Sequence, residues 1–102
     1  MDKPVVGFDW DDGNIGKCRK HGVSCREIEA ALSSRPAVAP DLKHSSSEQR
    51  FIAVQRNAAG RPMFIAFTYR HTADGVLIRP VSARYMHKKE AAAYEKSTRL
   101  ED

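Results

Sequence analysis

The second half of the chain contains three strand-like runs joined by short turns, and this pattern restricts the fold more than any other feature. The runs cover residues 50–56, 62–70 and 76–83 and are rich in β-branched and aromatic side chains. The links between them, residues 57–60 and 73–75, both end in glycine, which is typical of hairpin turns. The sequence therefore predicts three consecutive antiparallel strands in a meander.

A short strand and two short helices are predicted before the meander. Residues 5–10 form a β-branched and aromatic run, and the acidic residues that follow it suit a helix N-terminus. Gly22 is a natural left-handed stop for this first helix. Ser24 and Glu27 have the spacing of a capping box, in which each side chain satisfies a backbone donor of the other residue. The second helix is therefore expected to begin there.

The remaining segments complete a single α+β domain over residues 1–102. Residues 34–49 are polar and interrupted by proline, so they are expected to form a loop. After Tyr85 the chain becomes rich in alanine, lysine and glutamate, which predicts a closing helix over residues 86–97 and a frayed tail over residues 98–102. The expected order is β-α-α-β-β-β-α, with helices packed against a mostly antiparallel sheet.

The composition is that of a globular domain with a modest excess of positive charge. Hydrophobic residues make up 41% and charged residues 29% of the chain, and the net charge is +4. This charge favours polyanions or an acidic protein partner. The sequence has neither a membrane span nor a secretory signal, so a cytoplasmic location is expected. Cys18 and Cys25 match neither a metal knuckle nor a redox pair, and we expect free thiols.

Several arginines lie on or near the predicted strands, where alternation would place Arg79, Val81 and Ala83 on one face of the last strand. Arginine has a planar fork of donors that suits phosphate, and tyrosine can stack on unpaired bases. Solvated surface charge and ordinary core packing explain the same residues equally well. The candidate RNA-binding residues are Lys20, Arg50, Arg56, Tyr69, Tyr85 and Lys88.

Two of the four histidines are candidates for proton transfer. Metal-free RNA cleavage needs a base for the 2′-hydroxyl, a cation beside the charged phosphorane and an acid for the leaving oxygen. His21 ends the first predicted helix and His87 begins the closing helix, where a capping role explains His87 equally well. His44 and His71 fall in presumed loops. No pair of histidines or cysteines has the spacing of a metal site, so no metal or other cofactor is expected.

Several segments of the chain, taken together and in order, form a family pattern. They are Phe8-Asp-Trp-Asp11, Lys20-His-Gly-Val-Ser24, Arg50-Phe-Ile-Ala-Val54, Gly60-Arg61 and Ile78-Arg-Pro-Val-Ser-Ala-Arg84, followed by Glu90 and Tyr94-Glu95. This pattern resembles the BrnT family of bacterial toxins. The resemblance implies a RelE-like fold, ribonuclease activity that blocks translation, and neutralisation by a BrnA-type antitoxin with a DNA-binding domain.

Two functions follow from this resemblance. The first is a metal-independent endoribonuclease that cleaves mRNA, free or on the ribosome, with His21 and His87 transferring protons and Arg79 and Arg84 contacting the phosphate. The second is a non-catalytic interaction module that keeps the fold and binds an antitoxin or a transcriptional regulator. Only a measurement of RNA cleavage separates the two.

Overall fold

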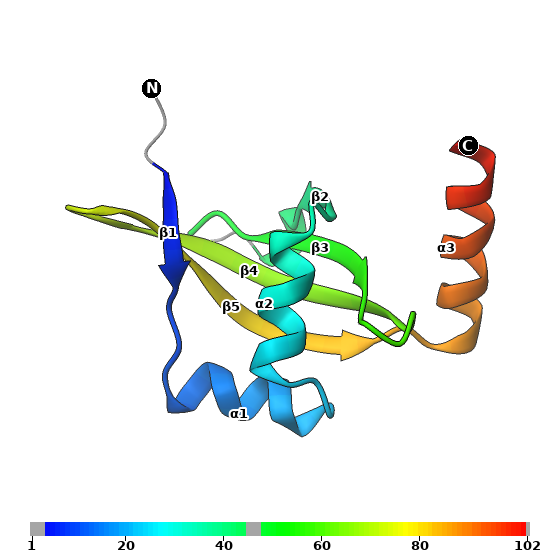
Figure 1. Cartoon of the computed structure of the whole chain (residues 1–102), viewed down its shortest axis with the longest axis horizontal. Helices are drawn as coiled ribbons and strands as arrows, with labels where there is room; N and C mark the ends of the chain where they lie inside the picture. The colour runs from blue at the N-terminus through cyan, green and yellow to red at the C-terminus, as the bar shows by residue number, and fades with distance from the viewer. Residues whose placement is uncertain (1–3, 45–47, 102) are drawn as a thin grey trace.

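The computed structural model describes residues 4–44 and 48–101 and shows an α+β fold with three α-helices and a five-stranded sheet (Figure 1). The strands lie in the order β1-β5-β4-β3-β2 across the sheet. In chain order the elements are β1 (Val5–Phe8), α1 (Asp12–Lys20), α2 (Cys25–Ser33), β2 (Ala37–Pro40), the short 3-10 helix η1 (Leu42–His44), β3 (Phe51–Arg56), β4 (Pro62–Thr72), β5 (Gly75–Tyr85) and α3 (Lys88–Glu101).

The predicted meander is confirmed, but the sheet is mixed rather than mostly antiparallel. Strands β3, β4 and β5 pair antiparallel in sequence, whereas β1 pairs parallel with β5. Hydrogen bonds from Val76 N to the Pro4 carbonyl and from Asp9 N to the Ile78 carbonyl, 2.9 and 2.8 Å long, fix this pairing. A parallel pair needs a long connection, which the chain between β1 and β5 supplies.

The segment predicted as a loop over residues 34–49 contains the edge strand β2. Its four residues pair antiparallel with β3, from Ala37 opposite Val54 to Pro40 opposite Phe51. The prediction was wrong here because prolines read as loop signals, yet an edge strand tolerates proline, since one of its sides needs no hydrogen bonds. The order of elements therefore gains a strand relative to the prediction, and residues 45–47 lie outside the described residues.

Both predicted helix starts are confirmed by their caps. The Ser24 hydroxyl accepts a hydrogen bond from Glu27 N at 3.1 Å, while the Glu27 carboxylate accepts one from Ser24 N at 3.1 Å. Helix α1 has a second capping box, between Asp11 and Asn14. Gly22, with φ of 78°, separates the two helices. Two satisfied caps so close together set the direction in which α1 and α2 return to the sheet.

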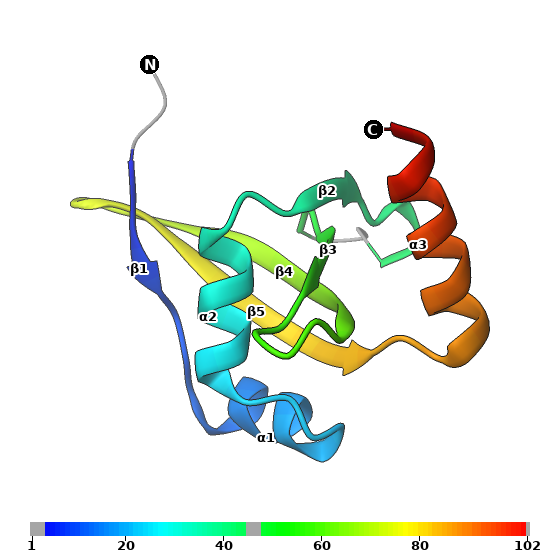
Figure 2. The same ribbon diagram turned by 45° about the vertical axis from the view of Figure 1, so that its right-hand side comes forward.

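Helices α1 and α2 pack against one face of the sheet and form the core there. Figure 2 shows α3 standing apart, at the end of the sheet farthest from β1. This helix runs to Glu101, past the predicted end at residue 97, and Asp102 lies outside the described residues. The core consists of Cys18, Val23, Ile28, Ala31, Ala53, Met63, Ile65, Phe67 and Ala83.

Strand β5 contains one more residue than β4 over the paired region, which is a β-bulge at Val81. On one side of the bulge Ser82 pairs with Ala66, and on the other side Pro80 pairs with Phe67. Inward and outward positions of β5 therefore change places at Val81, as they do wherever a strand gains a single residue.

The bulge corrects the predicted faces of β5. Strict alternation would put Arg79 on the same face as Ala83, but Ala83 is buried in the core. Arg79 instead pairs with Thr68, and Arg84 pairs with Phe64 on the same face of the regular strand β4. Arg79 and Arg84 therefore share the face of the sheet that α1 and α2 leave uncovered.

Candidate functional site

The face of the sheet opposite α1 and α2, called here the open face, has an apolar middle with arginines at both ends. One row across the strands contains Val54, Phe64 and Arg84, and the next contains Ile52, Ala66 and Ser82. Arg56 lies beyond the first row on β3, and Arg79 lies beyond the second row on β5. Within β3, Ile52, Val54 and Arg56 lie on the same face, as the alternation of side chains along a strand requires.

A hollow of about 420 Å³ lies in the first two rows of the open face. The C-terminal end of α1 and strand β5 both border this hollow. Two candidate catalytic residues, His21 and Arg84, therefore line the same space. Its floor is apolar except for the Ser82 hydroxyl side chain, and it is open to solvent at the His21 side chain, which is exposed. The lining residues are His21, Ile52, Phe64, Ala66, Ser82, Ala83 and Arg84.

The guanidinium group of Arg84 is held on two sides. Its carbon lies 4.8 Å from the centre of the Phe64 ring, and its two terminal nitrogens donate to the Glu90 carboxylate at 2.8 and 2.9 Å. The hydrogen bonds to Glu90 raise the pKa of Arg84 above its ordinary value. The Arg84 side chain is nevertheless 38% exposed and lines the hollow.

Glu90 connects this site to the start of α3. Its carboxylate accepts a hydrogen bond from the backbone N–H of His87 at 2.8 Å, three residues earlier, as at a helix N-terminus. Arg84 and then the His87 N–H lower the pKa of Glu90 to about 2. His87 and Lys88 are exposed beside this contact. His87 is therefore linked to Arg84 through Glu90, but it is not among the residues that line the hollow.

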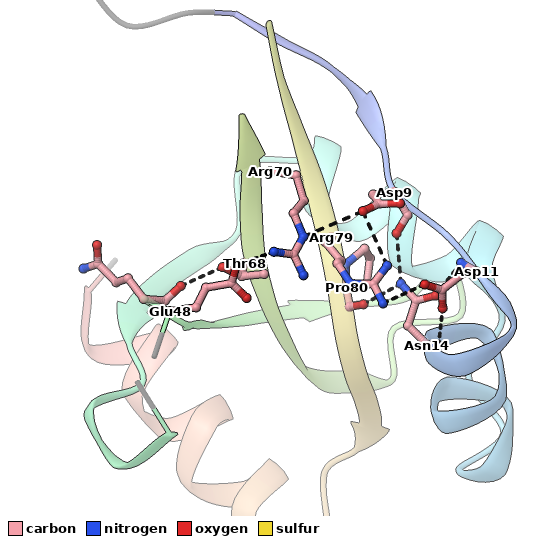
Figure 3. A network of polar contacts seen from close by, with 9 residues as sticks. Asp9, Asp11, Asn14, Glu48, Thr68, Arg70, Arg79 and Pro80 are labelled. Carbon is pink, nitrogen blue, oxygen red and sulfur yellow. Dashed lines mark hydrogen bonds and ion pairs between the residues drawn. The ribbon is translucent and has the colours of Figure 1, made fainter. Parts of the chain in front are cut away.

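Arg79, the fourth candidate catalytic residue, belongs to a different cluster (Figure 3). Its guanidinium lies 2.8 Å from the Asp11 carboxylate and 3.4 Å from that of Asp9, and its side chain is 20% exposed. Its row lies four steps along β4 from that of Arg84, a backbone distance of about 14 Å at the usual rise per residue. The two arginines also bind different carboxylates, Arg79 those of Asp9 and Asp11 and Arg84 that of Glu90.

The cluster around Arg79 joins three elements. The buried Asn14 side chain donates to the Asp9 carbonyl at 2.9 Å and to the Pro80 carbonyl at 2.7 Å (Figure 3). Arg70 forms ion pairs with Asp9 and Glu48 at its outer edge. No motif in the sequence marks Asn14. These contacts tie the segment between β1 and α1 to β5, which favours a structural role for Arg79.

The candidate RNA-binding residues are spread over the molecule. Arg56 is bound to α3, with its guanidinium 2.6 Å from the Glu95 carboxylate and 5.1 Å from the centre of the Tyr94 ring. Lys20 and Lys88 are exposed, at the end of α1 and the start of α3, while Arg50 is half-buried just before β3. Two of the six, Lys20 next to His21 and Tyr85 next to Arg84, adjoin a residue of the hollow in the chain.

The two candidate tyrosines lie against other aromatic or charged groups. The Tyr69 ring packs edge-on against the rings of Phe51 and Phe67, with ring centres 5.4 and 5.6 Å apart. Tyr69 is 37% exposed. The Arg61 guanidinium stacks on the Tyr85 ring, with its carbon 3.8 Å from the ring centre. The Tyr85 hydroxyl donates a hydrogen bond to the Glu27 carboxylate at 2.6 Å. Tyr85 thus resembles a packing residue, whereas Tyr69 keeps part of its ring accessible.

Replacing Tyr85 by phenylalanine should lower the free energy of unfolding by about 1 kcal/mol at pH 7, because Glu27 loses a charged hydrogen bond that is partly exposed. Tyr85, and then Asn57, lower the pKa of Glu27 to about 2. The stabilisation this provides is complete above the ordinary pKa and is lost as pH falls from about 4.5 towards 2. Urea unfolding from pH 7 to pH 3 should show the difference between the two proteins shrinking. An equal difference at all pH values would contradict this role.

Residues 4–44 and 48–101 contain neither a metal-binding cluster nor a helix that could span a membrane. No three histidine, cysteine, aspartate or glutamate side chains there lie close enough together to hold a metal ion. Cys18 is buried in the core, where burial raises the pKa of its thiol to about 11, and Cys25 is also a free thiol. Over the same residues, no helix is long and apolar enough to cross a membrane.

Comparison with known proteins gives one family. The family described as "Ribonuclease toxin, BrnT, of type II toxin-antitoxin system" matches residues 10–90. The match begins at Trp10, before α1, and ends at Glu90, in the first turn of α3, so it includes every residue that lines the hollow. A search of curated proteins finds no match.

Proposed function

Because the chain belongs to the BrnT family of ribonuclease toxins of type II toxin–antitoxin systems, we propose that the hollow between His21 and Arg84 is where it cleaves RNA without a metal ion. The observation that carries the proposal is the presence of an imidazole and a guanidinium in one solvent-open hollow, brought together from α1 and β5. No other hollow described in the structure contains this pair.

The proposed chemistry needs only groups that this chain supplies. The 2′-hydroxyl of the ribose attacks the adjacent phosphate, which forms a new O–P bond and breaks the bond to the 5′-oxygen of the next nucleotide. His21 exchanges a proton with one of these oxygens, and Arg84 faces the charge that accumulates on the phosphorane. His87, near Arg84 through Glu90, is the candidate for the second proton transfer.

The shape of the open face favours unpaired RNA as the substrate. Phe64, Ile52 and Ala66 provide an apolar floor against which a base can lie, and arginines stand at its margins. An intact double helix would present its phosphates to this surface but could not place a base on the floor. We therefore propose mRNA, free or on the ribosome, as the target, and the cytoplasm as the place of action.

One observation favours a second function. Arg84 is bound by a carboxylate of the same chain, and Arg79 by two. A protein that has lost cleavage but kept its interactions could retain such pairs without penalty. In this alternative the chain is an interaction module for a BrnA-type antitoxin with a DNA-binding domain, or for another transcriptional regulator.

A direct assay separates the two functions. Purified protein incubated with 5′-labelled single-stranded RNA in excess EDTA should produce fragments ending in a cyclic 2′,3′-phosphate or its hydrolysis product, because the 2′-hydroxyl is the nucleophile. The same RNA with 2′-O-methyl riboses should remain intact. Folded protein that leaves both RNAs uncut would refute the ribonuclease proposal and support the interaction module.

A further inference from the structure

Helix α3 is joined to the rest of the domain mainly through charged side chains. None of its side chains from Lys88 to Ser97 is fully buried, and the apolar core lies on the opposite face of the sheet. The views in Figures 1 and 2 agree that the helix stands at the end of the sheet rather than over the core. Burial of apolar surface, which anchors α1 and α2, therefore contributes little to the position of α3.

Two of the contacts that hold α3 join carboxylates of the helix to arginines of the open face. Glu90 binds Arg84 through two hydrogen bonds, and Glu95 binds Arg56 at 2.6 Å. The arginines come from the first row of the open face and from the end of β3 next to it, beside the proposed cleavage site. Glu90 presents both carboxylate oxygens to its guanidinium, as a phosphate group can, and Glu95 presents one.

We propose that α3 is a displaceable acidic arm, in which Glu90 and Glu95 occupy the guanidinium groups that RNA phosphates take when substrate binds. The inference rests on the proposed function, because it assigns the occupant of the same site. All four side chains are between 34% and 48% exposed, so exchanging a carboxylate for a phosphate requires little desolvation. In the free protein the arm covers both positive charges.

Because the arm covers these charges, the length of an RNA should affect how well it binds. A single phosphate must compete with a carboxylate that is tethered to the same chain and therefore present at high effective concentration. A strand of RNA that reaches both arginines replaces both carboxylates at once. The arm should therefore reject mononucleotides and short fragments more strongly than longer RNA.

The test removes the charge of the arm and keeps its shape. In the Glu90→Gln/Glu95→Gln variant the amide at position 90 can still accept from the His87 N–H, so the start of α3 is preserved. We expect this variant to bind an uncleavable 2′-O-methyl RNA at least tenfold more tightly than wild type at low salt, measured by fluorescence anisotropy in EDTA. Hydrogen exchange of α3 without RNA should also become faster.

The matched control is Asp12→Asn/Asp74→Asn, which makes the same change in net charge at exposed positions that belong to α1 and to the β4–β5 turn. It should change RNA affinity less than threefold. The proposal of a displaceable arm is refuted if the Glu90→Gln/Glu95→Gln variant binds the RNA no more tightly than this control. It is also refuted if hydrogen exchange of α3 in this variant is the same as in wild type. Cleavage of ordinary RNA by the wild type is measured in parallel, so failure of the arm is distinguished from failure of the ribonuclease proposal.

Discussion

Replacing Arg84 by alanine should lower the rate of RNA cleavage by about 10²- to 10³-fold, the usual effect of removing one group that stabilises developing charge. Arg84 lines the hollow, and a phosphate that replaces the Glu90 carboxylate would meet its fork of donors. The Phe64 ring, 4.8 Å from the guanidinium carbon, helps to keep the group in place as the phosphorane forms. Single-turnover cleavage of labelled RNA in EDTA would measure the loss.

The fold should survive this change, because a half-exposed ion pair contributes only about 1 kcal/mol or less. Arg61→Ala is a matched control, since Arg61 also stacks on an aromatic ring, that of Tyr85, but does not line the hollow. Arg84→Lys keeps the charge but loses the fork, so it should recover only part of the rate. Cleavage by Arg84→Ala at the wild-type rate would place the active site elsewhere.

Replacing His21 by alanine should lower cleavage by about 10²- to 10⁴-fold, the contribution expected of one proton-transfer group. The side chain is exposed at the end of α1, so its removal leaves the core intact. Added imidazole should restore part of the activity, because it can enter the solvent-open hollow and perform the same transfer. Rates with and without imidazole, measured at one pH, provide the test.

Chemical rescue separates a catalytic role for His21 from a structural one, since a helix terminus that had lost its packing would not be restored by free imidazole. His71→Ala serves as the control, because His71 is exposed and lies near the far end of β4, outside the hollow. It should cleave RNA at the wild-type rate. If His21→Ala keeps full activity while Arg84→Ala loses it, His87 becomes the remaining histidine candidate.

Local signals in the sequence were enough for most of the secondary structure. The capping box at Ser24 and Glu27, the stop at Gly22 and the glycine-containing turns of the meander all act between residues that are close in the chain. Their outcome depends little on the rest of the fold. Strand β2 was missed because a four-residue edge strand with a terminal proline has no local signal, and its only partner is β3.

The candidate site was predictable only as a set of residue types. The sequence indicated arginines near the strand ends and two candidate histidines, and the resemblance to the BrnT family indicated a role for them. The sequence did not separate Arg84, in the hollow, from Arg79, which is bound by Asp9 and Asp11. Both are arginines near the end of a strand, and their difference lies in residues that are distant in the chain.

By itself the sequence determined the helix caps, the meander, the positive charge and membership of a family, because each depends on neighbouring residues or on residue identity along the chain. Only the tertiary structure decided that β1 pairs parallel with β5 and that His21 and Arg84 line one hollow. It also decided which carboxylates Arg79 and Arg84 bind. The bulge at Val81 is the physical reason why Arg79 and Arg84 lie on the same face of the sheet. One extra residue exchanges the two faces of a strand, and no periodic pattern in the sequence marks where it occurs.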